Sequence, residues 1–425
     1  MNILVIGGGG REHAIIRKLK EDPRAETIYA LPGNGGIAAG AVCGGVGACD
    51  IPGMVDFAKA HAVDFVVVAP DDPLVLGAVD AFTAAGFPCF GPRKDAAAIE
   101  GSKVFAKELM KKYHIPTAAY EVFSDLAAAL DYVEHCPLPM VVKADGLALG
   151  KGVLICETRE AAREAVRSMM EGRIFGESGA RVVIEEFLTG PEVSVLSFTD
   201  GETVVPMVSS MDHKRALDGD QGLNTGGMGT VAPNPYYTPE IAAACMEAIF
   251  LPTIQAMRAE GRPFQGCLYF GLMLTADGPK VIEYNCRFGD PETQVVLPLL
   301  EGSLLEIMLA VSEGRLADTA VRFSGKSACC VILASQGYPQ TYEKGFPISL
   351  PETGADEHIY IAGAAEKDGQ LVTSGGRVLG ATAVADTLPA AIERAYALAG
   401  RIHFDNAYCR RDIGQRALQA MKEGA

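Results

Sequence analysis

The stretch KVIEYNCRFGDPETQ contains an acid and an amide two positions apart, Glu283 and Asn285, within residues that predict a strand. Residues two apart in a strand point to the same side, so both side chains present oxygen atoms to one face. Mg²⁺ prefers such hard oxygen ligands and usually adds phosphate oxygens and water. Arg287 follows on that face, and Asp290 and Glu292 lie in the turn beyond it. The spacing favours a site for a divalent ion and a phosphate over the alternative, an edge strand with a polar face.

A second stretch, MVVKADGLALGKGVLI, places Lys143 at the end of an apolar strand and follows it with a glycine-rich turn. It does not fit the Walker A pattern, because Gly146 and Gly150 enclose three residues and Lys151 is followed by Gly152. A strand lysine and a glycine flap can still bind a nucleoside triphosphate, since the lysine supplies charge and the amides of the flap cover the phosphates. A plain hairpin is the alternative.

Two carboxylates, Glu185 and Glu186, end the strand in RVVIEEFLTGPEVS, and Glu192 follows after a turn. Carboxylates at a strand end are usually solvated. Beside the lysine strand, however, the strand edge would offer backbone N–H and C=O groups to an adenine, and a carboxylate could accept hydrogen bonds from ribose hydroxyls.

The amino terminus, MNILVIGGGGREHAII, suggests a dinucleotide-binding fingerprint. That fingerprint needs a third glycine for close packing of helix on strand, and the two possible registers place Glu12 or His13 there. A nicotinamide-dependent dehydrogenase is therefore disfavoured. A strand, a glycine turn and a helix N-terminus remain, and these suit an anion, with Arg11 nearby. A tight turn that binds nothing is the alternative.

The polar loop DHKRALDGDQGLNTGGMG resembles a calcium loop at Asp218 and Asp220 only. The fifth and twelfth positions of that loop would be Gly222 and Gly229, which supply no side-chain ligand. A loop this rich in glycine and polar residues is more typical of one that encloses a small polar substrate.

The composition is that of an ordinary globular enzyme, with 49% hydrophobic and 21% charged residues among 425. The net charge of −16 argues against nucleic acid or an anionic membrane as a partner. Eleven cysteines show no zinc spacing, and Cys329 and Cys330 lie in an apolar run typical of a core. The sequence predicts a cytoplasmic protein without a signal peptide or a stretch of about 20 apolar residues.

Strands and helices alternate over the first 100 residues or so, which predicts a parallel sheet covered on both faces. Residues 115–195 are expected to contain several strands around one helix, TREAAREAVRSMM. A long helix, TPEIAAACMEAIFLPTIQAMRAEG, follows among further strands. The fold class is therefore α/β and α+β.

In this order, the motifs resemble the phosphoribosylamine–glycine ligase family of the ATP-grasp superfamily over nearly the whole chain. The segments that carry the resemblance are GGGGREHA, EGSK, VVKADGLALGKGV, EEFLTGPEVS, DHKRALDGDQGLNTGGMG, YNCRFGDPETQ and DIGQRAL. The resemblance implies an N-terminal α/β domain (1–101), an ATP-grasp body (102–322) with a mobile lid subdomain (117–190), and a small C-terminal domain (323–425).

The activity implied by the resemblance is ligation of glycine to 5-phosphoribosylamine in purine biosynthesis, with ATP as substrate and Mg²⁺ or Mn²⁺ as cofactor. The reaction passes through glycyl phosphate and gives glycinamide ribonucleotide, ADP and phosphate. The expected assembly is a monomer or a weak homodimer. The alternatives are another ATP-grasp carboxylate–amine or carboxylating ligase, and a non-catalytic nucleotide-binding regulator.

The resemblance also implies roles for individual residues. Glu283 and Asn285 would bind the divalent ion. Arg287, Asp212, Lys214 and Asn224 would lie at the reacting centre. The residues implied to bind ATP are Lys103, Lys143, Gly150, Lys151, Gly152, Glu185, Glu186, Phe187, Leu188 and Glu192. Those implied to bind glycine or phosphoribosylamine are Gly9, Arg11, Glu12, Thr225, Gly226, Gly227 and Asp290.

The sequence departs from the family pattern at several places. The strand LYFGLML supplies no further carboxylate for the metal, although many ATP-grasp enzymes have one there. Asp71, Met211 and Ile361 stand where the family commonly has Glu, Gln and His. These departures leave the ATP-binding motifs intact and concern the contacts with the other substrates.

Overall fold

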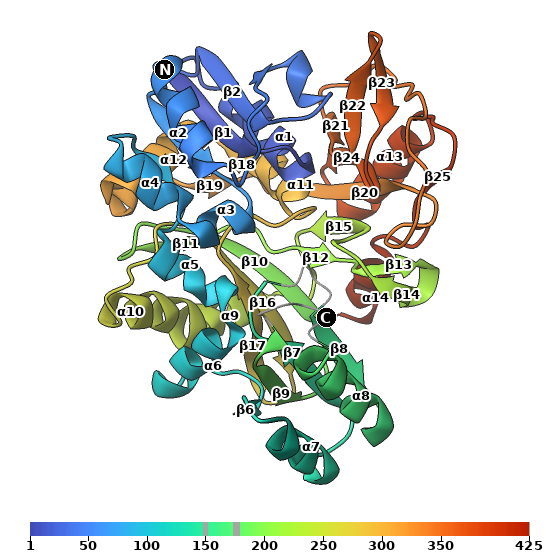
Figure 1. Cartoon of the computed structure of the whole chain (residues 1–425). Coiled ribbons are helices and arrows are strands. Elements are labelled where there is room, and N and C mark those ends of the chain that lie inside the picture. The colour runs from blue at the N-terminus through green and yellow to red at the C-terminus, as the bar shows by residue number, and fades with distance from the viewer. Residues whose placement is uncertain (148–151, 173–178, 425) are drawn as a thin grey trace.

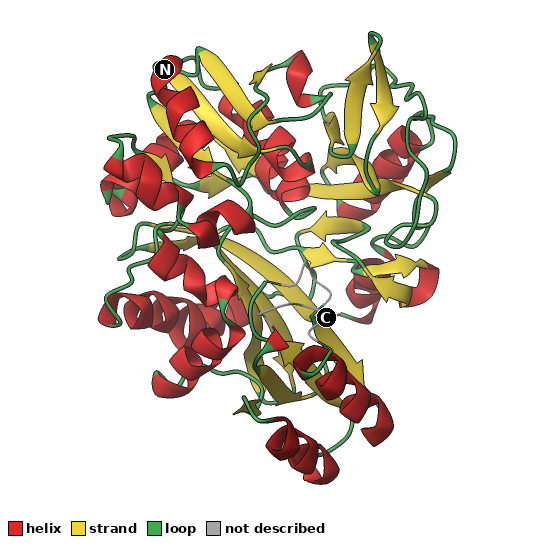
Figure 2. Ribbon diagram, viewed as in Figure 1, coloured by secondary structure: helices red, strands yellow, loops and turns green. Residues whose placement is uncertain are grey.

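The computed structural model describes residues 1–147, 152–172 and 179–424. The N-terminal and C-terminal parts lie side by side at one end of the molecule, and a smaller lobe of strands and helices lies at the other (Figure 1). Two antiparallel sheets occupy the middle and right of the same view (Figure 2). Helices and strands are mixed throughout, as the α/β and α+β prediction requires.

The N-terminal sheet has five parallel strands in the order β3-β2-β1-β4-β5, which confirms the expected parallel sheet. Its strands are β1 (Asn2–Gly7), β2 (Thr27–Pro32), β3 (Val42–Cys43), β4 (Phe65–Val68) and β5 (Cys89–Phe90). The helices of this part are α1 (Gly10–Leu19), α2 (Ile51–Ala60), α3 (Asp71–Leu76), α4 (Ala78–Ala84) and α5 (Lys94–Gly101).

Both faces of β1 are buried, and each packs against later parts of the chain. Ile3 and Val5 belong to a core shared with α12 (Leu304–Glu313), while Leu4 and Ile6 belong to a core shared with α10 (Leu251–Ala259). Alternate residues of a strand face opposite sides, so a continuous apolar run fills both cores. The glycine turn after β1 is therefore held rigidly against the middle of the molecule.

The central sheet, β11-β10-β16-β17, is antiparallel throughout. Its strands are β10 (Glu192–Thr199), β11 (Val204–Pro206), β16 (Gly266–Thr275) and β17 (Gly278–Asn285). Helix α6 (Lys103–Lys112) lies against β17 and leads towards the smaller lobe. This sheet carries the predicted metal-binding strand.

The predicted long helix is present over Pro239–Ala259, as α9 (Pro239–Cys245), a π-helical turn and α10. It is 21 residues long, and its apolar window has a mean hydropathy of 1.3, so the expectation that no stretch reaches the length of a membrane span was wrong. Ile249, Phe250, Ile254 and Met257 are buried in the core beneath the N-terminal sheet. The apolar residues of the Pro239–Ala259 helix therefore pack in this core.

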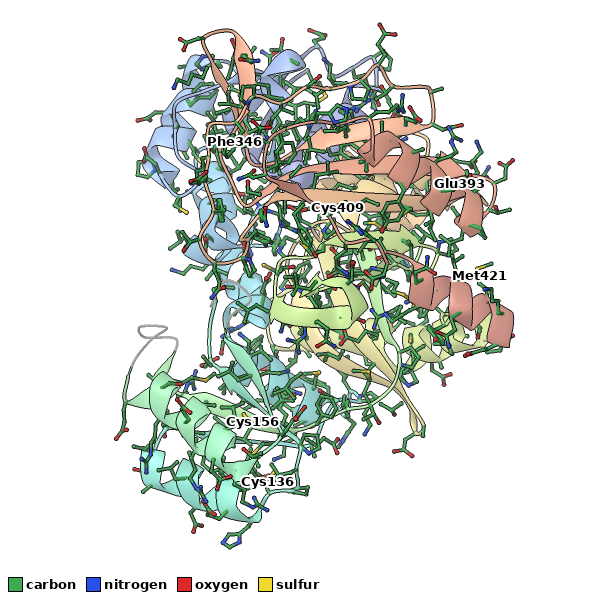
Figure 3. The ribbon with its side chains drawn as sticks, turned by 90° about the vertical axis from the view of Figure 1, so that its right-hand side faces the viewer. Cys136, Cys156, Phe346, Glu393, Cys409 and Met421 are labelled. Carbon is green, nitrogen blue, oxygen red and sulfur yellow. The ribbon has the colours of Figure 1, made fainter. Side chains whose placement is uncertain are left out.

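In its described residues the smaller lobe contains the antiparallel sheet β6-β9-β7-β8 and the helices α7 and α8, so the expectation of one helix was wrong. The extra helix, α7, begins after Asp125, whose carboxylate accepts from the N–H of Ala128. Thirteen buried side chains form a separate core here, among them Cys136 and Cys156 (Figure 3). The elements are β6 (Tyr120–Phe123), α7 (Leu126–His135), β7 (Met140–Ala144), β8 (Val153–Cys156), α8 (Arg159–Met170) and β9 (Val182–Glu186).

The last sheet joins the C-terminal strands to two short strands from the middle of the chain. Its order is β12-β15-β20-β24-β21, and β25 (Ala407–Tyr408) also pairs with β20. Cys329 and Cys330 are fully buried in β20, as predicted. The other elements are β12 (Met211–Asp212), β15 (Gly229–Ala232), β20 (Ser327–Ser335), β21 (Glu357–Ile361), β24 (Arg377–Ala385), α13 (Leu388–Ala399) and α14 (Gln415–Glu423).

Short hairpins complete the structure. They are β13 (Arg215–Leu217) with β14 (Gln221–Asn224), and β22 (Ala364–Lys367) with β23 (Gln370–Thr373). The strands β18 (Leu300–Glu301) and β19 (Arg322–Phe323) also form an antiparallel pair, but α12 lies between them in the chain. The β13–β14 hairpin lies within the polar loop singled out in the sequence. It packs beside α14 (Figure 1), and Asp218 and Asp220 are bound by Arg411 N–H and the Arg410 guanidinium.

Candidate active site

Strand β17 presents the two predicted metal ligands on one face. A bulge at Ile282 inserts an extra residue, so that Val281 and Tyr284 both face the core although they are three positions apart. Glu283 and Asn285 flank Tyr284 and therefore point to the opposite side. The side chain of Glu283 keeps 36% of its surface exposed, which leaves its oxygens accessible to a ligand.

Cations surround the Glu283 carboxylate. Lys214 Nζ lies 3.6 Å from Glu283 Oε1. Burial, the largest influence, would raise the pKa of Glu283, but Lys214, Lys143, Lys103 and Arg287 together hold it below the usual value. The carboxylate is therefore ionised at neutral pH, the state that a metal ligand requires.

Arg287 is fixed beside Asn285 by a residue that sequence reasoning missed. Its Nη2 donates to Asn285 Oδ1 at 3.1 Å and lies 3.2 Å from Glu100 Oε1. Glu100 also accepts from the N–H of Cys286 at 2.7 Å. In the described part of the chain, Arg287 Nε is buried without a hydrogen-bond partner, so a donor is left for a further acceptor.

This donor set fits Mg²⁺ or Mn²⁺ bound together with phosphate oxygens. Among the described residues no three histidine, cysteine or acidic side chains come together, so the protein offers no complete metal cage. Glu283 supplies one carboxylate, and the amide oxygen of Asn285 keeps a second lone pair beside the bond from Arg287. Magnesium sites with few protein ligands rely on substrate phosphates, which nearby cations also attract.

Lys103 lies near the same strand at the start of α6. Ser102 caps that helix, with its Oγ accepting from the N–H of Phe105. Lys103 Nζ donates to the carbonyl of Gly146 at 2.7 Å, and Asp145 accepts from Ser102 Oγ at 2.9 Å. These contacts tie the first residues of the predicted glycine flap to α6. Gly150 and Lys151 lie outside the described residues, and Gly152, which is described, accepts from the N–H of Ala144.

Lys143 is half of a buried pair of lysines that share one carboxylate. Lys143 Nζ and Lys107 Nζ each lie 3.0 Å from Glu185 Oε2, and all three side chains are at least nine-tenths buried. Lys143 also donates to the carbonyl of Ile282 at the bulge, which places it next to Glu283. In the described part of the chain Glu185 Oε1 has no partner. Lys107 follows Lys103 by one helical turn, a spacing that could have indicated it.

The remaining residues predicted to bind adenine or ribose lie at the edge of this cluster. Glu186 accepts from the N–H of Ala119 at 2.9 Å and turns outward, and Phe187 and Leu188 follow it outside the strand. Glu192, at the start of β10, lies 3.9 Å from Lys214 Nζ. The structure thus brings the described residues among those predicted to bind ATP and metal to one region. Their individual roles stay predictions.

Lys214 links this region to a second group of acids. Burial lowers the pKa of Lys214, but Glu283 and Glu192 raise it well above the usual value overall. Burial and the neighbouring Glu292 raise the pKa of Asp212 well above its usual value. Glu292 accepts from the hydroxyl of Tyr269 at 3.1 Å. The two acids thus place negative charge close together, which suits the binding of an amine.

The loop after β14 folds back onto Lys214. Thr225 N–H and Oγ1 both donate to the carbonyl of Lys214, at 2.8 and 2.9 Å, and Gly227 N–H donates to Thr225 Oγ1. Asn224, predicted at the reacting centre, is exposed at the end of β14. Gly226 and Gly227 instead lie near the turn that contains Asp290. Arg377 from β24 donates to the carbonyl of Gly226 and also to the carbonyl of Asp290.

The N-terminal glycine turn, which contains Gly9, borders the candidate site beside Asp290. Glu12 folds back to accept from the N–H of Gly9 and pairs with Arg11 Nε at 2.6 Å. Arg11 also donates to the carbonyl of Phe288 at 3.2 Å. A Cβ on Gly9 would lie 3.4 Å from Asp290 Oδ2, so the turn abuts the segment that follows β17. Gly9, Arg11, Glu12 and Asp290 are therefore neighbours, as a shared substrate site requires.

A buried histidine, His213, and a half-buried one, His13, predict how stability depends on pH. His13 Nδ1 accepts from the N–H of Ile361, and His213 Nε2 accepts from the N–H of Gly414. Burial lowers the pKa of each to about 4. Because the unfolded chain binds these protons below about pH 6.5, the stabilisation is complete above that pH and is lost as the pH falls towards 4, by up to about 3 kcal/mol each.

We expect the free energy of unfolding, measured with denaturant, to fall between pH 6.5 and 4. In a His213→Gln variant the stability at pH 7 should be lower and its decrease towards pH 4 shallower. His114→Asn, a change at an exposed histidine, should reproduce the pH profile of the unmodified protein. An identical pH profile in His213→Gln would contradict the assignment.

Models of one family match three consecutive parts of the chain. They are the N domain of phosphoribosylglycinamide synthetase at residues 1–100, its ATP-grasp (A) domain at 101–293 and its C domain at 328–416. The chain is 49% identical over 423 residues to a protein of Vibrio vulnificus (strain YJ016) named phosphoribosylamine–glycine ligase, covering 98% of this chain and 99% of that protein. A protein of the same name from Caldanaerobacter subterraneus subsp. tengcongensis is 47% identical, with coverage of 97% and 99%.

The chain is also similar to solved structures, one of them from the same family. A crystal structure of phosphoribosylamine–glycine ligase from Thermotoga maritima matches with a TM-score of 0.86 and 36% identity, covering 97% of this chain and all of that one. Biotin carboxylase from Campylobacter jejuni in complex with β-γ-ATP matches with a TM-score of 0.76 and 14% identity, covering 96% and 92%. The second likeness concerns the fold alone.

Proposed function

The chain belongs to the phosphoribosylglycinamide synthetase family, and from this premise we propose that it ligates glycine to 5-phosphoribosylamine at the expense of ATP. The products are glycinamide ribonucleotide, ADP and phosphate, and glycyl phosphate is the intermediate. The observation that carries the proposal is the convergence of Lys103, Lys143, Lys214 and Arg287 on the ionised Glu283. A carboxylate among four cations is suited to a divalent ion and a triphosphate.

The triphosphate would lie between β17 and the lysines. Lys103 and Lys143 would neutralise its phosphates, and the free Oε1 of Glu185 would face the nucleotide with the backbone of Phe187 and Leu188. Glu283 and Asn285 would hold Mg²⁺ or Mn²⁺, which would supply positive charge that stabilises the transferring phosphoryl group. Phosphoryl transfer requires positioning and charge stabilisation more than covalent help from the protein.

The acceptor would enter from the side of the N-terminal turn. Gly9, Arg11 and Asp290 line that side, and the N–H groups at the start of α1 suit the phosphate of phosphoribosylamine. Asp212 would take a proton from the attacking amine, because burial and Glu292 raise the pKa of its carboxylate and so make it a stronger base. The amine then displaces phosphate from glycyl phosphate. No serine or cysteine nucleophile is needed.

The test of this function is one assay. Purified protein is incubated with ATP, Mg²⁺ and phosphoribosylamine, with and without glycine, and ADP is followed. We expect ADP formation to depend on glycine and on phosphoribosylamine, and glycinamide ribonucleotide to appear in equal amount. ADP release with bicarbonate and no glycine would favour a carboxylating ligase instead.

We further propose that the enzyme works in the cytoplasm as a monomer or weak homodimer, without a nucleic-acid or membrane partner. All eleven cysteines are free thiols, which suits a reducing compartment. The net charge of −16 opposes binding to polyanions. Size-exclusion chromatography with light scattering tests the assembly.

A further inference from the structure

Arg377, the first residue of β24, reaches from the C-terminal sheet to two loops of the candidate active site. Its Nη1 donates to the carbonyls of Gly226 and Asp290, each at 2.8 Å. Its Nη2 lies 3.3 Å from Asp290 Oδ2. One guanidinium thus joins the loop after β14 to the turn after the metal-binding strand.

The two loops approach each other so closely that Gly227 requires glycine, and a side chain on Gly226 would displace the guanidinium of Arg377. A Cβ on Gly226 would lie 2.8 Å from Arg377 Cζ. Gly227 has a φ of +117°, and a Cβ there would lie 2.5 Å from Pro291 Cδ and 2.7 Å from Asp212 Oδ1. The glycines therefore let Arg377 bind the loop backbone directly and keep that loop against Asp212.

Tyr338 adds a second contact from the C-terminal part. Its hydroxyl accepts from the N–H of Gly226 at 3.2 Å, and its ring lies against Gly376, next to Arg377. The N–H and the C=O of one glycine are therefore both bound by side chains from beyond residue 330. This arrangement fixes the orientation of the two peptide groups on either side of the Gly226 Cα.

Asp290, which Arg377 contacts, also lies beside the N-terminal glycine turn. It accepts from Gln294 Nε2 at 2.7 Å and lies beside Gly9. Burial by itself would raise the pKa of Asp290. The nearby Arg377 and Arg11 outweigh that effect and hold the pKa below its usual value, so the carboxylate is ionised. The guanidinium contacts of Arg377 within the described residues go to Gly226, Gly227 and Asp290, on the side of the acceptor, and not to the lysines expected to hold ATP.

We propose that Arg377 is a positioning residue for the binding of phosphoribosylamine. It holds Asp290 and the Gly226–Gly227 turn at one spacing, and so defines the acceptor side of the site without contacting the nucleotide. The inference rests on the proposed function, in which Asp290, Gly226 and Gly227 meet the substrates. It gives the C-terminal part a role in catalysis as well as in folding.

The experiment compares Arg377→Gln and Arg377→Lys with Arg394→Gln as the matched control. Arg394 also lies in the C-terminal part, on α13, and donates to the carbonyl of Val384 away from the site. KM for ATP, glycine and phosphoribosylamine and kcat are measured for each variant. Exchange of the β,γ-bridging oxygen of ATP, with glycine present and phosphoribosylamine absent, reports the first half-reaction separately.

We expect Arg377→Gln to raise KM for phosphoribosylamine by about tenfold to 100-fold while KM for ATP and the isotope exchange stay within about twofold. Arg377→Lys should recover part of the loss, because it keeps a charge beside Asp290 but lacks the planar fork. Arg394→Gln should match the unmodified enzyme. Tyr338→Phe removes only the hydroxyl and should raise the KM for phosphoribosylamine by a smaller factor. This variant tests the inference if Arg377→Gln does not fold.

An unchanged KM for phosphoribosylamine in both Arg377→Gln and Tyr338→Phe would overturn the inference, as would an equal rise in KM for ATP. Failure of the proposed function looks different, because the unmodified protein would then form no ADP in response to glycine. The two results are read from separate samples of the same assay.

Discussion

Replacing Glu283 by alanine is expected to abolish ADP formation while leaving the fold intact. Glu283 is the one carboxylate on the metal-binding face of β17, and its removal leaves only the amide of Asn285 for the divalent ion. The loss of one preorganised charge at a developing transition state costs about 10²–10³-fold in kcat, and here the metal would be lost as well. The measurement is the rate of ADP release with glycine and phosphoribosylamine at saturating ATP.

The fold should tolerate this change. Glu283 is partly exposed, and its ion pair with Lys214 is long, at 3.6 Å, so stability should change by no more than about 1 kcal/mol. The control is Asp277→Ala, at an exposed carboxylate in the turn between β16 and β17, which should keep full activity. Normal ADP formation by the Glu283→Ala protein, with its usual dependence on Mg²⁺, would refute the metal assignment.

Replacing Lys143 by methionine is expected to weaken ATP binding by about tenfold to 100-fold, or about 1.4–2.8 kcal/mol. Lys143 is held between Glu185 and the carbonyl of Ile282, so its ammonium group is preorganised beside the phosphates proposed next to Glu283. A charge-assisted hydrogen bond to a phosphate is lost in the variant. Isothermal titration with ATP and Mg²⁺ measures the change.

The buried triad needs its own control, since losing one lysine leaves Glu185 less well compensated. Lys107→Met removes the other lysine, which donates to Thr117 and not to the bulge. Breaking either buried pair costs about 3–5 kcal/mol of stability, which chemical denaturation measures. If both variants weakened ATP binding equally, the effect of Lys143 would come from the disrupted triad and not from contact with phosphate.

The sequence could predict features that depend on local periodicity. Glu283 and Asn285 face one side of β17 because alternation within a strand follows from backbone geometry. The parallel N-terminal sheet followed from continuous apolar strands separated by helices. The sequence missed α7, although Asp125 carries the chemistry of a helix cap, and overlooked that Pro239–Ala259 reaches the length of a membrane span.

The candidate site could be predicted only as a set of separate motifs. Lys107 belongs to none of the quoted motifs, and Glu100 begins EGSK but was assigned no role. Each contacts a residue far along the chain, Glu185 or Arg287. Arg377 belongs to none of the quoted motifs, yet it contacts the carbonyl of Asp290, 87 positions earlier in the chain. Such pairs depend on which strands neighbour each other, and local patterns carry no information on that order.

The sequence alone thus determined the chemical groups, their faces on individual strands and the family that they resemble. Only the tertiary structure decided which charges meet: two lysines on one glutamate, four cations near Glu283, and an arginine of the C-terminal sheet across two loops. The physical reason is that electrostatic contacts act over a few ångströms of space. Distance along the chain does not set distance in space once seven sheets have formed among the described residues.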